Sequence, residues 1–301
     1  MENSGLALAF AFLAALGFAS GNILIRIGTQ QVAAPTATFF TVLTGAILVL
    51  GLAFAFNRPD IVALPPVLYG WFALMGALAY LIARVFNNTA IAMIGASRAT
   101  PIASLQPVFA FGLGVAFLGE RPNLLVILGT PMTACGLVLV FLSASATRSK
   151  GQVLTIKTLG YLLALGAAAS FASRDVISRY VVSSLAPPLV AAGFALAMGG
   201  FMLLAVVHRD VVNSLHRLPG RYIIICGLAG ICQGLAVASL FQALSRAPVT
   251  VVSPINASSP LITLVLAHVF LRRLESINLV LVVGTLLSVG GVALVVLGAS
   301  I

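Results

Sequence analysis

The chain has 301 residues, of which 61% are hydrophobic and only 7% are charged. Because a soluble domain carries about 25% charged residues, this composition excludes an ordinary soluble fold. The net charge of +10 would suggest a nucleic-acid partner for a soluble chain, but here the basic residues lie mostly at the ends of apolar segments. In that position they orient a membrane protein and contact lipid headgroups. We therefore expect a lipid bilayer around this chain and no nucleic acid among its partners.

Ten apolar segments follow one another, each close to the length of about 20 residues that a helix needs to cross a bilayer. They cover residues 5–29, 34–56, 66–87, 98–118, 122–144, 157–181, 187–207, 221–243, 250–271 and 275–299. Backbone polar groups must pair internally in lipid, and the apolar runs are continuous rather than alternating, so we predict helices rather than a β-barrel. The predicted fold class is an all-α integral membrane protein with ten transmembrane helices.

The pattern of the first five segments recurs in the last five. Pro101 and Pro107 in the fourth segment are matched by Pro254 and Pro260 in the ninth, each at a shift of 153 residues. A proline inside a helix removes a hydrogen bond and clashes with the preceding turn, so we predict helix breaks at all four prolines. Broken helices at corresponding places of a duplicated bundle point to a secondary transporter with its site between the repeats.

A polar stretch between the fifth and sixth segments divides the chain. We predict a first five-helix repeat over residues 1–146, a linker over 147–156 and a second five-helix repeat over 157–301. Because five is an odd number, the second repeat must enter the membrane in the opposite direction. The two repeats are then inverted, and a pseudo-two-fold axis in the membrane plane relates them.

Basic residues are unevenly divided between the two faces of this bundle. The richer face holds eight of them, namely Arg148, Lys150, Lys157, Arg209, Arg217, Arg221, Arg272 and Arg273. The positive-inside rule places that face in the cytoplasm and both termini outside.

Polar side chains inside apolar spans are costly, so each is a candidate for function. The candidates for a substrate cavity are Ser20, Asn22, Tyr80, Asn88, Ser104, Gln106, Ser173, Gln233, Gln242, Asn256 and Ser258. The prolines add backbone carbonyls freed from their helical partners, which together with hydroxyls and amides can bind a zwitterionic solute. The alternative is that the prolines only kink helices for packing, and that Tyr80 lies at the membrane interface.

Asp175 is the one carboxylate well inside a span. It lies four residues before Arg179, as Asn22 lies four before Arg26, and such pairs share a helix face. A structural ion pair with Arg174 or Arg179 is the favoured interpretation. A proton-coupling role for Asp175, together with Arg179, is the alternative.

Several catalytic patterns are missing from the sequence. It contains no GxxxxGK[ST] for a nucleotide, no HExxH, no paired carboxylates and no TVGYG-like filter. We therefore predict a protein that is not an enzyme, with no cofactor, no metal and no catalytic residues.

The chain resembles the drug/metabolite transporter superfamily, and within it the EamA-type permeases. The resemblance covers nearly the whole chain and rests on motifs that are weak singly but occur in order and in duplicate. These motifs are Phe18 to Arg26 with Phe171 to Arg179, Ala90 to Pro107, Phe117 to Glu120, and Gly129 with Gly136. The second repeat departs from the pattern with two additional residues before Glu275.

The resemblance implies export of small metabolites, most often amino acids, without ATP, and cytoplasmic termini, against the charge count. The chain is similar to bacterial aromatic amino-acid exporters, but it has serine, asparagine and phenylalanine where those carry cavity tryptophans. This favours a broader range of neutral amino acids, exported from the cell by a monomer in the plasma (inner) membrane. The alternatives are a drug, nucleotide-sugar or lipid-linked-sugar transporter of the same superfamily, and a non-transporting membrane scaffold.

Overall fold

The computed structural model describes residues 2–94, 96–146, 158–215, 220–271 and 279–300, and these residues form helices without a strand. In chain order the helices are α1 (Glu2–Gly28), α2 (Ala34–Phe56), α3 (Arg58–Val62), α4 (Val67–Gly76), the π-helix η1 (Ala77–Ile82), α5 (Ala83–Ile94), α6 (Ala96–Ala103), α7 (Gln106–Leu118), α8 (Leu124–Ala146), α9 (Thr158–Ser184), α10 (Pro188–Leu215), α11 (Gly220–Arg246), α12 (Val249–Asn256), α13 (Ser259–Leu271) and α14 (Leu279–Ser300). The predicted linker, 147–156, lies outside the described residues.

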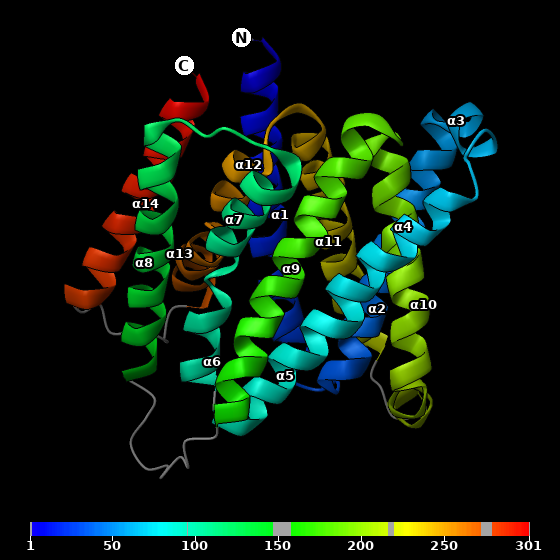
Figure 1. The fold of residues 1–301 in the computed structure, drawn as a ribbon. Helices are drawn as coiled ribbons and strands as arrows, with labels where there is room; N and C mark the ends of the chain where they lie inside the picture. Colours follow the sequence, from blue (N-terminus) through cyan, green and yellow to red (C-terminus); the bar gives the residue numbers. More distant parts are fainter. Residues whose placement is uncertain (1, 95, 147–157, 216–219, 272–278, 301) are drawn as a thin grey trace.

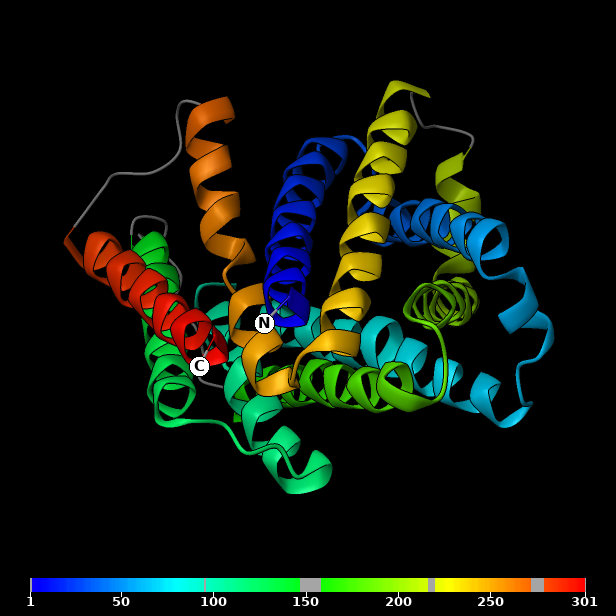
Figure 2. The ribbon, with the colours of Figure 1, turned by 90° about the horizontal axis from the view of Figure 1, so that it is seen from above.

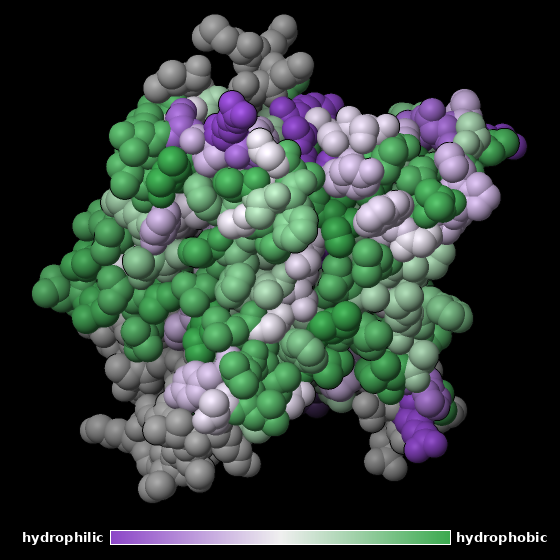
Figure 3. Space-filling view, viewed as in Figure 1, coloured by the Kyte–Doolittle hydropathy of each residue, from purple (hydrophilic) through white to green (hydrophobic). Residues whose placement is uncertain are grey.

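The helices fit a membrane. Within the described part of the chain, seven are long and apolar enough to cross a bilayer, and apolar surface extends across the middle of the molecule between hydrophilic margins (Figure 3). Every predicted segment overlaps one helix or a series of shorter ones, so the all-helical class is confirmed. That all ten segments cross the bilayer stays a prediction, because the segments in α8, in α9 and in α12 with α13 are not among these seven described spans. Of these, α9 has the length but carries three charges, Arg174, Asp175 and Arg179.

Helix contacts come in pairs that the duplication relates. α1 packs along α11, and its counterpart α9 packs along α5 and η1. α2 packs against its own counterpart α10, and α8 against its counterpart α14, at one end of the molecule (Figure 2). In Figure 1 the first repeat begins at the upper face with α1, whereas α9 begins at the lower face. This arrangement agrees with two inverted repeats.

Both proline-containing segments are broken at equivalent places. α6 ends before residues 104–105 and α7 follows, while α12 ends before residues 257–258 and α13 follows. The two breaks are therefore separated by the repeat shift of 153 residues. Pro107 and Pro260 are each the second residue of the helix after the break, a position where the missing N–H has no helical partner to lose. The breaks predicted at Pro101 and Pro254 do not occur, because these prolines lie inside α6 and α12, where each removes one hydrogen bond without ending the helix.

Glycines allow the closest helix approaches. A Cβ added to Gly136 of α8 would lie 2.6 Å from the carbonyl oxygen of Gly284 in α14, and one added to Gly234 of α11 would lie 2.8 Å from the Cα of Gly45 in α2. Apolar surface gains little from leaving lipid, so contacts between backbones and small residues hold membrane helices together.

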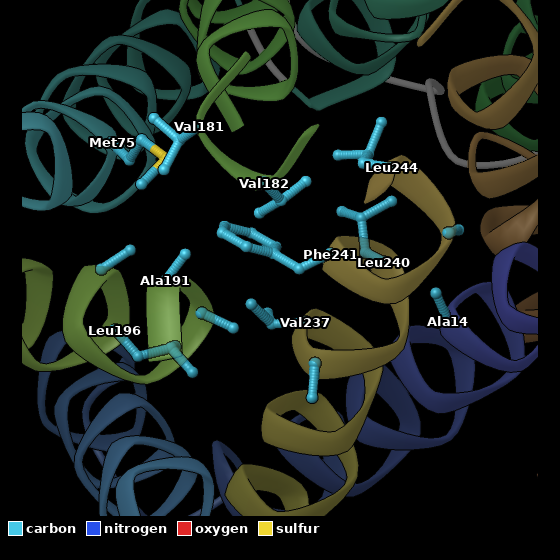
Figure 4. Packing of buried hydrophobic residues seen from close by; sticks show 14 of the residues in the cluster. Ala14, Met75, Val181, Val182, Ala191, Leu196, Val237, Leu240, Phe241 and Leu244 are labelled. Atoms are coloured by element: carbon cyan, nitrogen blue, oxygen red, sulfur yellow. The ribbon is translucent and has the colours of Figure 1, made fainter. Parts of the chain in front are cut away.

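The central apolar core lies among α4, α9, α10 and α11. The ring of Phe241 projects from α11 toward Val182 of α9, with Val237 and Leu196 nearby (Figure 4). Phe241 is 1% exposed. This core fixes the positions of α9 and α11, which carry Arg174, Asp175 and Gln233.

Candidate substrate cavity

A cavity of about 70 Å³ lies between the two repeats. It is bounded by α1, α2, η1 and α5 of the first repeat and by α9, α10 and α11 of the second. The side chains and backbone that line it belong to Phe18, Thr41, Val42, Ala79, Tyr80, Arg84, Phe171, Arg174, Leu196, Gln233, Gly234 and Val237. Helices α6, α7, α12 and α13, which the sequence favoured, are not among the lining elements.

Residues related by the repeat face one another across this cavity. Phe18 and Phe171 differ by the repeat shift of 153 residues, and so do Tyr80 and Gln233. Equivalent positions of two inverted repeats meet only near the axis that relates them, so the cavity lies at that axis. Transporters built from inverted repeats place their substrate sites there.

The first repeat contributes an aromatic ring and a cation. Tyr80 lies in the π-helix η1, and the Arg84 guanidinium lies one turn later with its Cζ 5.5 Å from the centre of the Tyr80 ring. This distance is typical of a cation–π contact. Gly199 of α10 makes room for the ring, because a Cβ there would collide with the Cδ2 atom of Tyr80. Short π-helical turns are frequent at functional sites.

The second repeat contributes an ion pair. Arg174 lines the cavity, and its Nη2 lies 3.2 Å from Oδ1 of Asp175, a side chain that is 1% exposed. The other carboxylate oxygen accepts a hydrogen bond of 2.9 Å from the Gln106 amide of α7. Asp175 is thus held by two partners and is not among the residues that line the cavity.

An amide pair joins α1 to α11. The Gln233 amide donates to Oδ1 of Asn22 over 3.2 Å, and Gln233 lines the cavity. Gly21 leaves room for this contact, because a Cβ there would lie 2.6 Å from Cγ of Gln233. Among the predicted cavity residues, the structure therefore brings Tyr80 and Gln233 to the cavity and Asn22 into contact with Gln233. Gln106 contacts Asp175, which does not line the cavity.

The remaining candidates lie apart from the cavity lining. Several bond to their own helix: Ser104 to the carbonyl of Thr100, Ser173 to that of Ala169, and Ser258 to that of Ile255. Gln242 accepts from Arg246 at the upper end of α11. Asn88 is exposed, Ser20 is half-buried, and the half-buried Asn256 keeps a buried Oδ1 atom without a hydrogen-bond partner.

Asp175 and Arg179 are not paired, although they are one helical turn apart. Arg179 donates to the carbonyl of Leu244 instead. That carbonyl belongs to the last turn of α11, where helix carbonyls have no intrahelical partner and attract cations. Asp175 forms its ion pair with its sequence neighbour Arg174 instead.

A further group of polar contacts joins the two repeats at the upper face. The Glu120 carboxylate follows α7 and accepts hydrogen bonds from the backbone N–H groups of Val249 and Thr250, at 2.7 and 2.9 Å. These groups open α12, where a carboxylate is favoured by the helix dipole. The Arg246 guanidinium lies 5.1 Å from the ring centre of Phe10 in α1. A second cavity of about 230 Å³ lies beside these contacts and includes Arg121, Asn123 and Thr250.

Sequence reasoning missed three polar members of the lining, Thr41, Arg84 and Arg174. Arg84 gave a usable signal, because a charge inside an apolar span is a functional candidate by default. Thr41 gave none, since a threonine donating to the carbonyl of Ala37 in its own helix is ordinary in a membrane span.

No group of three or more His, Cys, Asp or Glu side chains that could hold a metal occurs in the described part of the chain. The lining offers one phenol, one amide, one hydroxyl and two guanidinium groups. It can therefore bind a small polar solute by hydrogen bonds and charge. The fold and this cavity define a multi-pass membrane protein built from two repeats, of the secondary-transporter class.

The chain belongs to the EamA-like transporter family, whose sequence model matches residues 5–142 and again 158–297. It is thus a membrane transporter of the drug/metabolite transporter type, and the double match fits the two-repeat architecture. The fold is shared with a solved crystal structure at 21% sequence identity and a TM-score of 0.75, with 98% of this chain and 97% of that one covered. No curated protein matches the chain.

Proposed function

We propose that this transporter exports small metabolites, with amino acids as the leading substrates, across the plasma membrane by alternating access and without ATP hydrolysis. The observation that carries the proposal is the cavity on the axis between the repeats, lined from both by related pairs of side chains. Rocking of one repeat against the other around such a site exposes it alternately to the two faces. A monomer suffices, because both halves of the cavity come from one chain.

The size of the cavity supports a small solute. Its volume of about 70 Å³ is well below the 300–1,000 Å³ of sites for drug-sized ligands. Its apolar members, including Phe18, Phe171 and Leu196, suit an aliphatic or aromatic side chain, while the polar members suit a carboxylate and an ammonium group. These properties favour an amino acid over a drug or a nucleotide sugar.

The arrangement of Asp175 supports facilitated diffusion over proton coupling. A coupling carboxylate must exchange its proton with the pathway, yet both oxygens of Asp175 face protein partners, Arg174 and Gln106. The same contacts argue against a drug-cation site, which needs an unpaired carboxylate in the cavity.

The substitution Gln233→Leu tests the proposed site. It removes the amide that lines the cavity at nearly constant volume, and we expect about tenfold lower amino-acid flux in liposomes because a hydrogen bond in a water-poor site is lost. Gln30→Leu, in the exposed turn after α1, is the matched control and should transport as the unaltered chain does. If Gln233→Leu transports amino acids as fast as the unaltered chain, with equal amounts of protein in the liposomes, this cavity is not part of the transport pathway.

A further inference from the structure

We propose that Arg84 binds a carboxylate group of the transported solute, so that the site selects solutes that carry one. This inference names a substrate class and rests on the proposed function for its cavity. It starts from the charges around the cavity. Two guanidinium groups line it, those of Arg84 and Arg174, and no carboxylate does among the described lining residues.

The two arginines are not equivalent. Arg174 has Asp175 as an ionic partner at 3.2 Å. The Nε atoms of both arginines are buried without a hydrogen-bond partner, but Arg84 has in addition no carboxylate within 4.0 Å in the described part of the chain. Its guanidinium contacts only the face of Tyr80 in the interactions that the structure shows. A charge removed from water costs free energy unless a partner compensates it. A bound anion would therefore offset the cost of placing the Arg84 guanidinium beside the cavity.

The repeat shows that the fold does not require either cation. The position equivalent to Arg84 in the second repeat is Val237, and the position equivalent to Arg174 in the first repeat is Gly21. The same five-helix unit therefore folds with small apolar or glycine residues at both places. Val237 lines the same cavity and Gly21 adjoins it through Gln233, so packing at these two positions of the repeat does not call for a cation.

Geometry favours a carboxylate as the partner of Arg84. A guanidinium matches a carboxylate with two parallel N–H···O bonds, and it does so most strongly where water is excluded. The Tyr80 ring, whose centre lies 5.5 Å from the Arg84 Cζ atom, packs against the guanidinium. The rest of the lining is neutral or apolar apart from the paired Arg174.

A comparison of three matched ligands tests the inference on purified full-length protein by titration calorimetry, which does not depend on flux. The ligands are leucine, 4-methylpentanoate, which lacks the ammonium group, and leucinamide, which lacks the carboxylate. We expect leucine and 4-methylpentanoate to bind and leucinamide to bind at least about tenfold more weakly, the usual effect of one charge-assisted hydrogen bond. Arg84→Gln should abolish this difference, Arg84→Lys should keep part of it, and Arg221→Gln, an exposed arginine of α11, should keep all of it.

The outcomes separate this inference from the proposed function. Binding of 4-methylpentanoate without leucine supports the carboxylate site and contradicts an amino-acid substrate. Equal binding of leucine and leucinamide overturns the carboxylate site but is compatible with an amino-acid substrate. An unchanged preference for leucine over leucinamide in Arg84→Gln also overturns the carboxylate site. Binding of inorganic phosphate alone, or of no carboxylate, also overturns it. If Arg84→Gln does not fold, the affinities of the three ligands for the unaltered chain and for Arg84→Lys still test the carboxylate site.

Discussion

Single residues carry the charge balance of the bundle interior. Arg174, Asp175 and Gln106 form a connected set in which Asp175 is 1% exposed. Its Oδ2 accepts a hydrogen bond from Gln106, and its Oδ1 has the charge of Arg174 at 3.2 Å but no hydrogen-bond partner. A buried ion pair contributes little net stability compared with apolar residues, but removing one partner leaves an uncompensated charge. We therefore interpret Asp175 as the residue that allows Arg174 to remain charged beside the cavity.

The variant Asp175→Asn should lower the free energy of unfolding by about 3–5 kcal/mol, because Arg174 loses its counter-charge. The double variant Arg174→Gln with Asp175→Asn should be more stable than Asp175→Asn alone. Thermal unfolding in detergent of the two single variants and the double variant measures this coupling. Additive losses of stability would show that the two side chains do not act as a pair.

Small residues and capping groups fix the arrangement of the helices. Gly136 and Gly284 bring α8 and α14 into backbone contact, and the Ser288 hydroxyl donates to the carbonyl of Thr133 over 3.3 Å across the same interface. Glu120 ties the end of α7 in the first repeat to the start of α12 in the second. The first interface is fixed by sterics, whereas the second consists of hydrogen bonds that can break and reform.

Gly136→Val should destabilise the protein by about 1–3 kcal/mol or more, because the new side chain overlaps backbone atoms of α14 that cannot move aside. Gly112→Val is a matched control, since a Cβ at Gly112 in α7 meets no atom within 4 Å. Melting temperatures in one detergent compare the two. If both variants melt together with the unaltered chain, α8 and α14 are not in the contact described.

Glu120→Gln should open the upper face more often, because the amide keeps the shape of the side chain but loses the charge that favours the α12 N-terminus, a change of about 0.5–2 kcal/mol. A cysteine introduced at Val251, which borders the upper cavity, should then react faster with a membrane-impermeant maleimide. Asp60→Asn, an exposed carboxylate change in α3 on the same face, should leave the rate unaltered. An unchanged rate in Glu120→Gln would mean that this contact does not restrain the upper face.

At the scale of the whole molecule, the duplicated pattern determined how much could be predicted. Hydropathy and the matched prolines predicted the helical class, both helix breaks and the two repeats, because each depends on local chemistry. The faces of the helices could not be predicted as well. Lipid and protein core are both apolar, so a membrane helix shows little periodicity to tell one from the other. For this reason the sequence does not indicate that Thr41 of α2 and Leu196 of α10 line the cavity.

The partner of Asp175 could not be predicted from the sequence either. Spacing favoured Arg179, one turn away, but the open carbonyls at the end of α11 attract that arginine. Which partner a side chain meets depends on the neighbouring helix, and the register between α9 and α11 is set by packing around Phe241. Tyr80 and Gln233, by contrast, were accessible from the sequence because polar groups in mid-span are rare.

We propose that the cavity between the repeats carries amino acids passively. Counterflow of a panel of labelled amino acids into liposomes containing the purified protein, with and without a pH gradient, tests it most directly. We expect saturable exchange that the gradient does not change and that Gln233→Leu reduces. Exchange that follows the gradient, or no exchange of any amino acid in the panel, would contradict it.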